Sequence, residues 1–581
     1  MKQVSPFAIL LLYQLLTGTA NAGMSIVDSK HNLSVTGPGE IRALTEDRIC
    51  IFCHTPHNAA PYTPLWNRNL QPTNYTLYES STLSAAPQQP AGPTRLCLSC
   101  HDGTIALGNV LQPAEGIQMN MELTARRSNL GTNISNDHPV SFNYYEALPN
   151  PELSPIIPPG LRTYGTGNIH CTTCHDPHDD TFGKFLVMGN QYSALCTTCH
   201  TNITGWSGSS HATSSKTWMK GEMAIPRTVA EHACASCHTP HGAGGAKRLL
   251  HQLEEEKNCY PCHDGTVASL DIKSQFTKMS HHPIEATTID ITGNAHDPAE
   301  DLTFLQGHVE CVDCHNPHAV NSDQAVVPNA SGRLTGVAGK DKNTVVIDPL
   351  VYEYELCFKC HGDSSNSIPL ITRWLNENNT INEFSPSNPS YHPVVAIGRN
   401  PDMPSLPSTH EPELTASSMI RCIDCHDGND SAAIGGSGPR GPHGSIYRPI
   451  LRQRYDTFDG QPESETAYAL CYRCHDRTKL LDDQGFYNAS DYNADGEPRD
   501  AGHRGHVVKH GAPCSACHDP HGVQNDGNGD HTHLINFDAA IVSPYGTNTT
   551  PIFDDLGTRS GRCALLCHGI SHDGGPTYTY P

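Results

Sequence analysis

The sequence predicts a mostly irregular, loop-rich fold with short α-helices and little β-structure. Three observations lead to this expectation: the 581 residues include 49 Gly and 44 Pro, only 36% are hydrophobic, and 24 are Cys. Gly and Pro interrupt regular elements, and together they exceed the ~12% that is usual in globular chains. With so few apolar side chains, a chain of this length is not expected to rest on large hydrophobic cores. Something other than side chains should fill its interior.

The first 22 residues have the pattern of an export signal. Lys2 precedes a largely apolar run over residues 7–16, and Ala20, Asn21 and Ala22 form an A-x-A cleavage site. The apolar run is too short to span a bilayer, and no stretch of about 18 apolar residues follows it. The mature chain is therefore expected to be exported and to have no membrane span.

The formal net charge of −23 results from 60 acidic and 37 basic residues. Such an acidic chain is a poor match for nucleic acid or an anionic membrane surface, and neither is expected as a partner. Cationic proteins and metal ions remain open, while a solubilising surface explains the acidity without any partner.

All cysteines fall into twelve pairs, and a histidine follows each pair directly. Eleven pairs read CxxCH, and the last reads CxxxCH. The twelve sets are Cys50, Cys53, His54; Cys97, Cys100, His101; Cys171, Cys174, His175; Cys196, Cys199, His200; Cys234, Cys237, His238; Cys259, Cys262, His263; Cys311, Cys314, His315; Cys357, Cys360, His361; Cys422, Cys425, His426; Cys471, Cys474, His475; Cys514, Cys517, His518; and Cys563, Cys567, His568.

CxxCH is the attachment signature of c-type haem, in which two thiols bond to the porphyrin vinyl groups and the histidine reaches the iron. Zinc sites and disulfide frameworks also use paired cysteines, but neither needs a histidine at the next position. We therefore expect twelve covalently bound haems, with the cysteines as tethers and the adjacent histidines as iron ligands.

The motifs repeat as six units of two. We expect one haem pair in each of residues 23–135, 136–208, 209–279, 280–385, 386–500 and 501–581. Between the motifs most of the chain is predicted to be loop, for example residues 156–160, 435–444 and 525–530. The clearest helix signal covers residues 248–257, which lead into Cys259 with leucines on one side.

Each unit also supplies two further candidate iron ligands. One follows a proline three residues after the first motif's histidine: His57, His178, His241, His318 and His521, with His443 as a displaced equivalent in the fifth unit. The other lies upstream of the first motif: His31, His138, His211, His282, His392 and His506. Four histidines match the needs of two six-coordinate irons. We hypothesise that the upstream histidine binds the first haem of its unit and the proline-preceded histidine the second.

Other ligand choices remain open. His503 and His510 compete with His506, and methionine is a less favoured axial ligand because the chain has only 10. Ten more histidines could replace the choices above: His170, His232, His251, His281, His296, His308, His410, His531, His533 and His572.

The chain resembles the multihaem c-type cytochromes with doubled CxxCH motifs of metal-respiring bacteria. The resemblance rests on CIFCHTPH (50–57), CLSCHDGT (97–104), CTTCHDPH (171–178), CSACHDPHG (514–522) and the HPV sequences at His138 and His392. It implies a periplasmic, extracellular or outer-membrane-associated protein with low-potential bis-histidine haems. It also implies other redox proteins or cytochromes as partners, with an outer-membrane porin conduit or self-association into filaments as candidate assemblies.

Two classes of function fit twelve haems. An electron carrier keeps every iron six-coordinate, whereas a reductase leaves one iron open for its substrate. No attachment motif lacks its histidine, and histidines are in excess. The sequence therefore favours a non-enzymatic dodecahaem carrier over a multihaem reductase, and it indicates no catalytic residue. The resemblance implies that such a carrier is active in respiration towards metal oxides or other external acceptors.

Overall fold

The structure is a computed structural model that describes residues 25–62, 64–123, 128–218, 226–284, 309–362, 370–400, 403, 405–406, 414–481, 502–557, 560–573 and 578–579. The predicted export signal and three of the alternative histidines, His296, His308 and His410, lie outside these residues.

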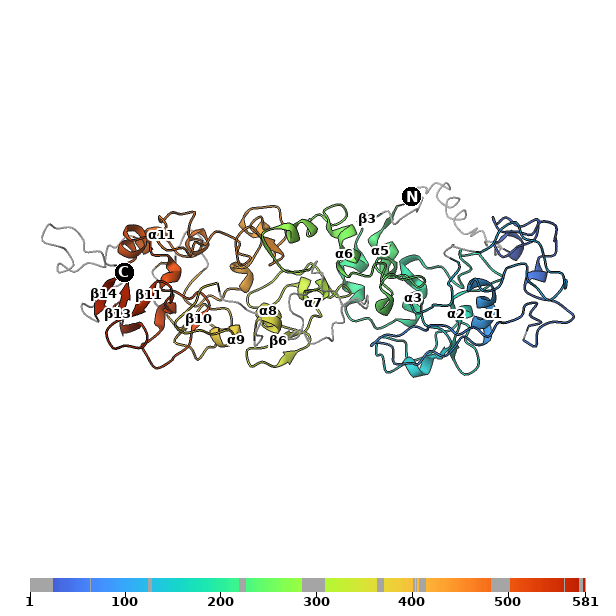
Figure 1. Cartoon of the computed structure of the whole chain (residues 1–581), viewed down its shortest axis with the longest axis horizontal. Coiled ribbons are helices and arrows are strands. Elements are labelled where there is room, and N and C mark those ends of the chain that lie inside the picture. Colours follow the sequence, from blue (N-terminus) through green and yellow to red (C-terminus); the bar gives the residue numbers. More distant parts are fainter. Residues whose placement is uncertain are drawn as a thin grey trace, which may run out of the picture. The chain divides into compact units, whose positions relative to one another are not determined.

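Most of the described chain is loop and turn, as the composition predicts (Figure 1). The α-helices are short: α1 Gly92–His101, α2 Cys171–Cys174, α3 Ala194–Cys199, α4 Ser210–Thr213, α5 Val229–His232, α6 Glu256–His263, α7 Cys311–Cys314, α8 Glu353–His361, α9 Thr380–Glu383, α10 Ala469–Tyr472 and α11 Arg477–Leu481. The 3₁₀ turns include η3 Cys50–Phe52, η7 Ala233–Ser236, η8 Ala246–Arg248, η12 Cys422–Asp424, η16 Cys514–Ala516 and η17 Thr532–Leu534, and η15 Arg504–Lys509 is a π-helical turn.

The eleven CxxCH motifs account for many of these turns. The histidine N–H donates to the carbonyl of the first cysteine, four residues earlier, which closes one helical turn. This bond measures 2.8 Å between His54 and Cys50 and 2.9 Å between His175 and Cys171. One such turn brings both thiols and the histidine together, so the local fold serves the attachment motif.

The helix predicted over residues 248–257 is wrong except for its last two residues. Helix α6 begins at Glu256, and Leu249 has a left-handed backbone with φ 53°. The carbonyl of Arg248 accepts a hydrogen bond from Nδ1 of His238, and the carbonyl of Leu249 accepts one from the Thr239 N–H. These carbonyls serve the preceding motif and are not available for a helix.

The β-structure is sparse, as predicted, and consists mainly of two-residue ladders. The strands are β1 Phe142–Asn143, β2 Asn168–Ile169, β3 Thr217–Trp218, β4 Arg227–Thr228, β5 Ser280–His281, β6 Gly339–Lys340, β7 Val346–Ile347, β8 Ser390–Tyr391, β9 Gly444–Ser445, β10 Gly522–Val523, β11 Val542–Pro544, β12 Ile552–Gly557, β13 Ser560–Cys567, β14 Ile570–Asp573 and β15 Tyr578–Thr579.

One larger antiparallel sheet, which the sequence did not predict, lies near the C-terminus (Figure 1). Its order is β11-β13-β12, and β14 and β15 also pair with β13. The last attachment motif therefore lies on a strand, unlike the other eleven. The other sheets of the described chain have two strands each.

The described hydrophobic clusters are small. The largest comprises six buried side chains, among them Tyr354 and Phe358 of α8 and Ile381 of α9. Three more clusters hold only three buried residues each. Such clusters cannot provide a continuous core for a chain of this length, which fits an interior built around cofactors.

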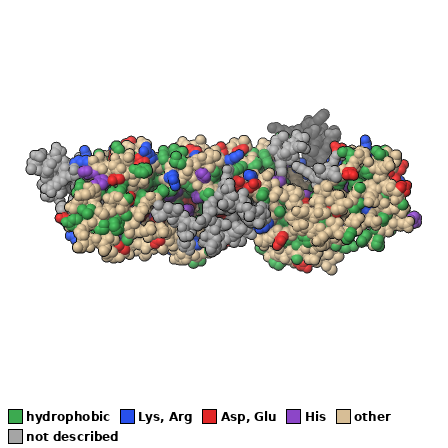
Figure 2. All heavy atoms as spheres, viewed as in Figure 1, with side chains coloured by type: hydrophobic (Ala, Val, Ile, Leu, Met, Phe, Trp, Pro, Cys, Tyr) green, Lys and Arg blue, Asp and Glu red, His purple; other side chains and the backbone are tan. Residues whose placement is uncertain are grey.

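The chain divides into two compact units, Met1–Ile203 with Ala230–Glu254, and Thr204–Val229 with Glu255–Pro581. The proposed division into six haem pairs remains a prediction. Among the described residues, no helix combines the length and apolar character needed to cross a bilayer. Figure 2 shows acidic and basic side chains interspersed on the face drawn, within a surface formed largely by backbone and uncharged polar groups.

Candidate haem-binding sites

Imidazole rings face each other in pairs at nearly constant separation. The ring centroids lie 6.1 Å apart for His31–His101, 6.2 Å for His54–His178, 6.1 Å for His175–His241, 6.1 Å for His211–His263, 6.4 Å for His282–His361, 6.1 Å for His315–His443, 6.1 Å for His426–His521 and 6.1 Å for His503–His518. A metal ion bound on both sides at about 2 Å from each nitrogen would hold two imidazoles roughly 6 Å apart. Each pair includes one histidine of an attachment motif, so the geometry fits a bis-histidine iron.

Two other motif histidines have upstream histidines as electrostatic neighbours. Burial lowers the pKa of His138 to about 4, and the nearby His200 adds to this shift. Burial likewise lowers the pKa of His475 to about 4, with a further contribution from His392. Both rings are thereby kept neutral, the form that binds a metal.

The pairing differs from our sequence hypothesis. The upstream histidine faces the second motif of its own repeat, as His31 faces His101. The proline-preceded histidine faces the first motif of the preceding repeat, as His178 faces His54. The hypothesis assumed that ligands stay within one repeat, whereas the structure links consecutive repeats.

A Pro-His dipeptide can contribute to two neighbouring iron sites, one through the proline carbonyl and one through the histidine ring. Nδ1 of His31 lies 3.1 Å from the carbonyl oxygen of Pro177, next to His178. The same contact joins His211 to Pro317, His282 to Pro442 and His392 to Pro520. An Nδ1–H that donates to a carbonyl leaves Nε2 free to bind a metal. The carbonyl thus orients one imidazole while the following histidine lies opposite another.

Two of the candidates, His57 and His506, depart from this rule. His57 is exposed, and no other described imidazole lies against it. The ring of His318 lies edge-on to Trp206, with centroids 6.0 Å apart. At the C-terminal end His503 faces His518, and His506 faces His572 at 5.9 Å.

The thiols of consecutive motifs are neighbours. Hydrogen-bonding pairs connect the second motif of one repeat to the first of the next: Cys97 with Cys171, Cys196 with Cys234, Cys259 with Cys311, Cys357 with Cys422 and Cys471 with Cys514. Within repeats, electrostatic neighbours are Cys53 and Cys100, Cys174 and Cys199, Cys314 and Cys360, and Cys425 and Cys474. The Glu255, Cys259 and Cys311 cluster, whose donor atoms lie within 4.8 Å of one another, belongs to this series.

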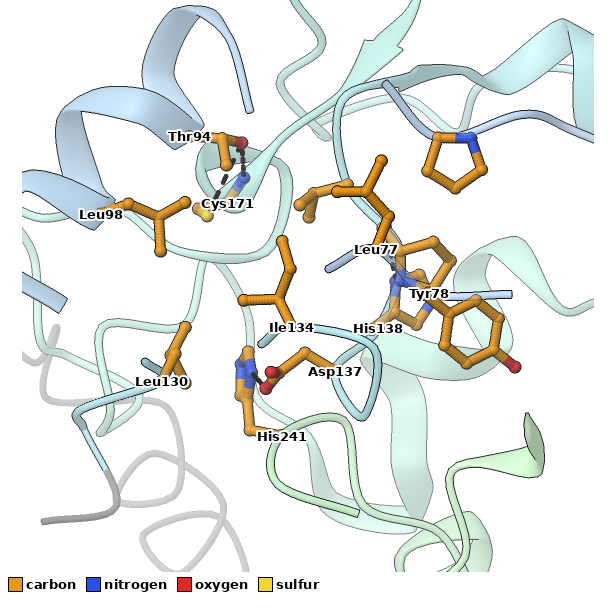
Figure 3. A pocket seen from close by; sticks show the side chains of 13 residues that line it. Leu77, Tyr78, Thr94, Leu98, Leu130, Ile134, Asp137, His138, Cys171 and His241 are labelled. Atoms are coloured by element: carbon orange, nitrogen blue, oxygen red, sulfur yellow. Dashed lines mark hydrogen bonds and ion pairs between the residues drawn. The ribbon is translucent and has the colours of Figure 1, made fainter. Parts of the chain in front are cut away.

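One pocket shows that an attachment thiol and a ligand ring share a cavity (Figure 3). Cys171 and His241 both line it, and Asp137 accepts a hydrogen bond of 2.9 Å from Nδ1 of His241. The remaining wall is largely apolar, with leucine, isoleucine, proline and valine side chains. A thiol, a fixed imidazole and apolar walls fit a covalently bound porphyrin.

Comparison with known proteins agrees with this chemistry. A family model described as the doubled CXXCH motif matches residues 165–205 and 227–268. Two stretches of the chain thus match the doubled CXXCH motif of multihaem c-type cytochromes. Over 208 residues, the chain is 24% identical to a protein named multiheme cytochrome MtrA from Shewanella baltica (strain OS185). The alignment spans 34% of this chain and 43% of that relative, less than half of its length.

The protein orients its motif histidines with a segment that the sequence analysis missed, which we call the clip. In the clip of His54, the carbonyl of Pro64 accepts a 2.7 Å hydrogen bond from Nδ1, Leu65 has φ 58°, and Trp66 bridges to the His54 backbone. The same three features recur at residues 184–186 for His175, 248–250 for His238 and 533–535 for His518. The left-handed backbone of a bulky residue is strained, so its recurrence indicates a role in fixing the imidazole. A faint sequence signal exists: a pair of apolar residues 10 to 17 positions after each of these four motif histidines.

Buried arginines are a second feature that the sequence analysis missed. Arg68 is fully buried, and its guanidinium donates to the carbonyls of Ser99, in the second motif, and Leu107. Arg452 donates to the carbonyl of Asp424 in the ninth motif. Because nothing in the local sequence distinguishes these arginines from exposed ones, only the tertiary structure reveals them.

Ligand tuning can be tested at His521, whose Nδ1 donates a 2.9 Å hydrogen bond to Glu383. A carboxylate partner makes an imidazole a stronger donor to a ferric iron. We expect Glu383→Gln to raise the reduction potential of the haem at His426 and His521, as measured by spectroelectrochemical titration. Glu377→Gln is the matched control, since this carboxylate contacts Asn379 and Asn382 and no imidazole. Equal titration curves for both variants would contradict the assigned tuning.

Proposed function

We propose that the protein carries electrons along twelve covalently bound haems in chain order. Each haem, when bound, supplies one Fe(III)/Fe(II) couple. The protein's part is to fix the tethers and ligands: thiols anchor the ring, and a clip or proline carbonyl holds Nδ1 so that Nε2 is free for the iron. The single observation that carries this proposal is the repeated facing of two imidazoles about 6 Å apart.

The order of the tethers supports transfer along the chain. Thiols of one motif lie against thiols of the next, both within repeats and between them. Consecutive haems would then be anchored side by side, and electron transfer does not require a separate mobile carrier. The eight facing imidazole pairs also favour a carrier over a reductase, because an iron between two imidazoles would have neither axial position left for a substrate.

The location, the partners and the electron acceptor are proposed on the same basis. The export signal and the likeness to a multihaem cytochrome support a periplasmic, extracellular or outer-membrane-associated location. We propose other redox proteins or cytochromes as partners, with a porin conduit or a filament as the candidate assembly and external acceptors such as metal oxides as the destination. A reductase with one open iron is the alternative function.

The test is a haem count with the spin state of every iron. We expect intact-mass analysis and the pyridine haemochrome assay to give twelve haems in the mature protein, and EPR of the fully oxidised protein to show only low-spin ferric iron. Carbon monoxide should not bind rapidly to the reduced protein. A high-spin iron that binds carbon monoxide would instead favour the reductase.

A further inference from the structure

His443 differs from the other proline-preceded histidines in its place in the sequence. The others lie three residues after the motif histidine of their own repeat, whereas His443 lies seventeen residues after His426. Its ring nevertheless faces His315 with centroids 6.1 Å apart, and the two ring planes differ by only 15°. The chain thus brings His443 to the equivalent iron site by a different backbone path.

Two imidazoles in the equivalent place have a carboxylate as the acceptor for Nδ1. Nδ1 of His241 donates a 2.9 Å hydrogen bond to Asp137, and Nδ1 of His521 donates one of the same length to Glu383. Such a bond makes the imidazole a stronger electron donor to a ferric iron. It therefore stabilises Fe(III) relative to Fe(II) and lowers the reduction potential.

The same nitrogen of His443 has no such partner. Nδ1 of His443 is buried, and none of the residues that the structure describes accepts a hydrogen bond from it. The carbonyl of the preceding Pro442 already accepts a 2.7 Å hydrogen bond from Nδ1 of His282. When Nε2 binds the iron, Nδ1 must carry a proton. At His443 that proton has no acceptor, so the ring is a weaker donor than His241 or His521.

Gly441 leaves space beside this nitrogen. Its φ is 109°, and a Cβ added there would lie 3.2 Å from Cε1 and 3.5 Å from Nδ1 of His443. A longer side chain at position 441 would therefore reach the nitrogen, and glycine has none.

Burial and charge act in the same direction as the missing hydrogen bond. Burial lowers the pKa of both His315 and His443, and the positive charge of Arg333 adds to both shifts. These surroundings disfavour positive charge. An iron between the two rings carries one more positive charge as Fe(III) than as Fe(II), so the same surroundings favour Fe(II).

We propose that the iron between His315 and His443 has a higher reduction potential than the irons bound by His241 and His521, so that electrons collect there. This iron accepts one electron from a reduced neighbouring haem and passes from Fe(III) to Fe(II), while the neighbour's iron returns to Fe(III). The inference rests on the proposed electron carriage and adds a holding site to it.

The test introduces an acceptor at position 441. Gly441→Asn places an amide oxygen within reach of Nδ1, and Gly441→Ala is the matched control, because it adds the same Cβ and backbone strain without an acceptor. Spectroelectrochemical titration of the full-length holoprotein should show one component at lower potential in the Asn variant than in the Ala variant. In wild type this component should be reduced before the one that Glu383→Gln shifts, which marks the haem at His521.

A second measurement leaves position 441 unchanged. His443→Gly and His521→Gly each create a cavity that added imidazole or 1-methylimidazole can fill, and the methylated ligand has no N–H. We expect the potential of the refilled haem to differ more between the two ligands in His521→Gly, where imidazole can donate to Glu383, than in His443→Gly. This comparison decides the matter if the position-441 variants fail to fold.

Three outcomes overturn the inference: equal titrations of the Asn and Ala variants, a shifted component that is reduced after the one at His521, and an equal effect of the two ligands in both cavities. Each of them leaves the carrier function intact if every iron of the wild type is low-spin. A high-spin iron in wild type contradicts the carrier function, and this inference with it.

Discussion

Replacing His178 by alanine is expected to convert one iron, that of the haem on Cys50 and Cys53, from low spin to high spin. His178 faces His54 across 6.2 Å, although the two residues belong to different repeats. Without the second imidazole this iron has one axial position open to water or an added ligand. EPR of the oxidised variant should show one high-spin iron per chain, and the reduced variant should bind one carbon monoxide.

His57→Ala is the matched control for this prediction. His57 occupies the same place in its CHxPH motif, but its ring is exposed and no described imidazole lies against it. The control should therefore keep wild-type spin states. If His57→Ala also produced a high-spin iron, the histidine pairing seen in the structure would be incorrect.

One histidine in each of the first and last repeats does not follow the pairing seen between consecutive repeats. His57 lies in the first of the six repeats of this sequence, and His518 lies in the sixth. His503 faces His518 from within the same repeat, at 6.1 Å. Because His503 already lies opposite His518 in the same chain, an iron bound by His518 would not need an axial histidine from a second copy of the chain. This argues against filament growth through a shared ligand at His518.

The sequence was sufficient to predict which residues form the haem sites, but it was not sufficient to predict which histidines pair at each iron. Cysteine spacing defines each attachment motif because the tether geometry is local, and proline before His178 or His241 marks a second set of candidate ligands. Spacing alone does not say which iron a ligand reaches, since Pro177 and His31 meet across 146 positions in the chain. That contact depends on tertiary folding, so the expected pairing within repeats was wrong.

The predicted helix over residues 248–257 and the unpredicted C-terminal sheet also depend on contacts between distant parts of the chain. The apparent helix at residues 248–257 carries leucines on one side, but the carbonyls of Arg248 and Leu249 bond to the preceding motif. The C-terminal sheet was missed because the CxxxCH motif resembles its helical counterparts in composition. Local patterns predicted short elements and loops, whereas long-range hydrogen bonds decided which of them formed.

Substituting Arg373 by methionine is expected to destabilise the region around the eleventh motif by on the order of 3–5 kcal/mol, the usual cost of leaving a buried charge without its partner. The buried guanidinium donates to the carbonyls of Ser515 and His518, within that motif, and of Asn536, just after its clip. Its Nε also lies 3.7 Å from the buried Asp519. Methionine fills similar space but leaves these carbonyls without the guanidinium donor and the carboxylate without its cationic partner.

Hydrogen exchange with mass spectrometry measures this effect locally, because a loss of about 3 kcal/mol accelerates exchange through local opening by more than a hundredfold. Peptides covering residues 514–538 should lose protection, while those around the first two motifs should not change. Arg399→Met is the matched control: Arg399 donates to the carbonyls of Ser387 and Asn388 but is exposed, so its loss should cost less than about 1 kcal/mol. Equal protection in both variants would show that Arg373 does not hold the motif against its clip, and the buried arginines would then have no structural role at these haem sites.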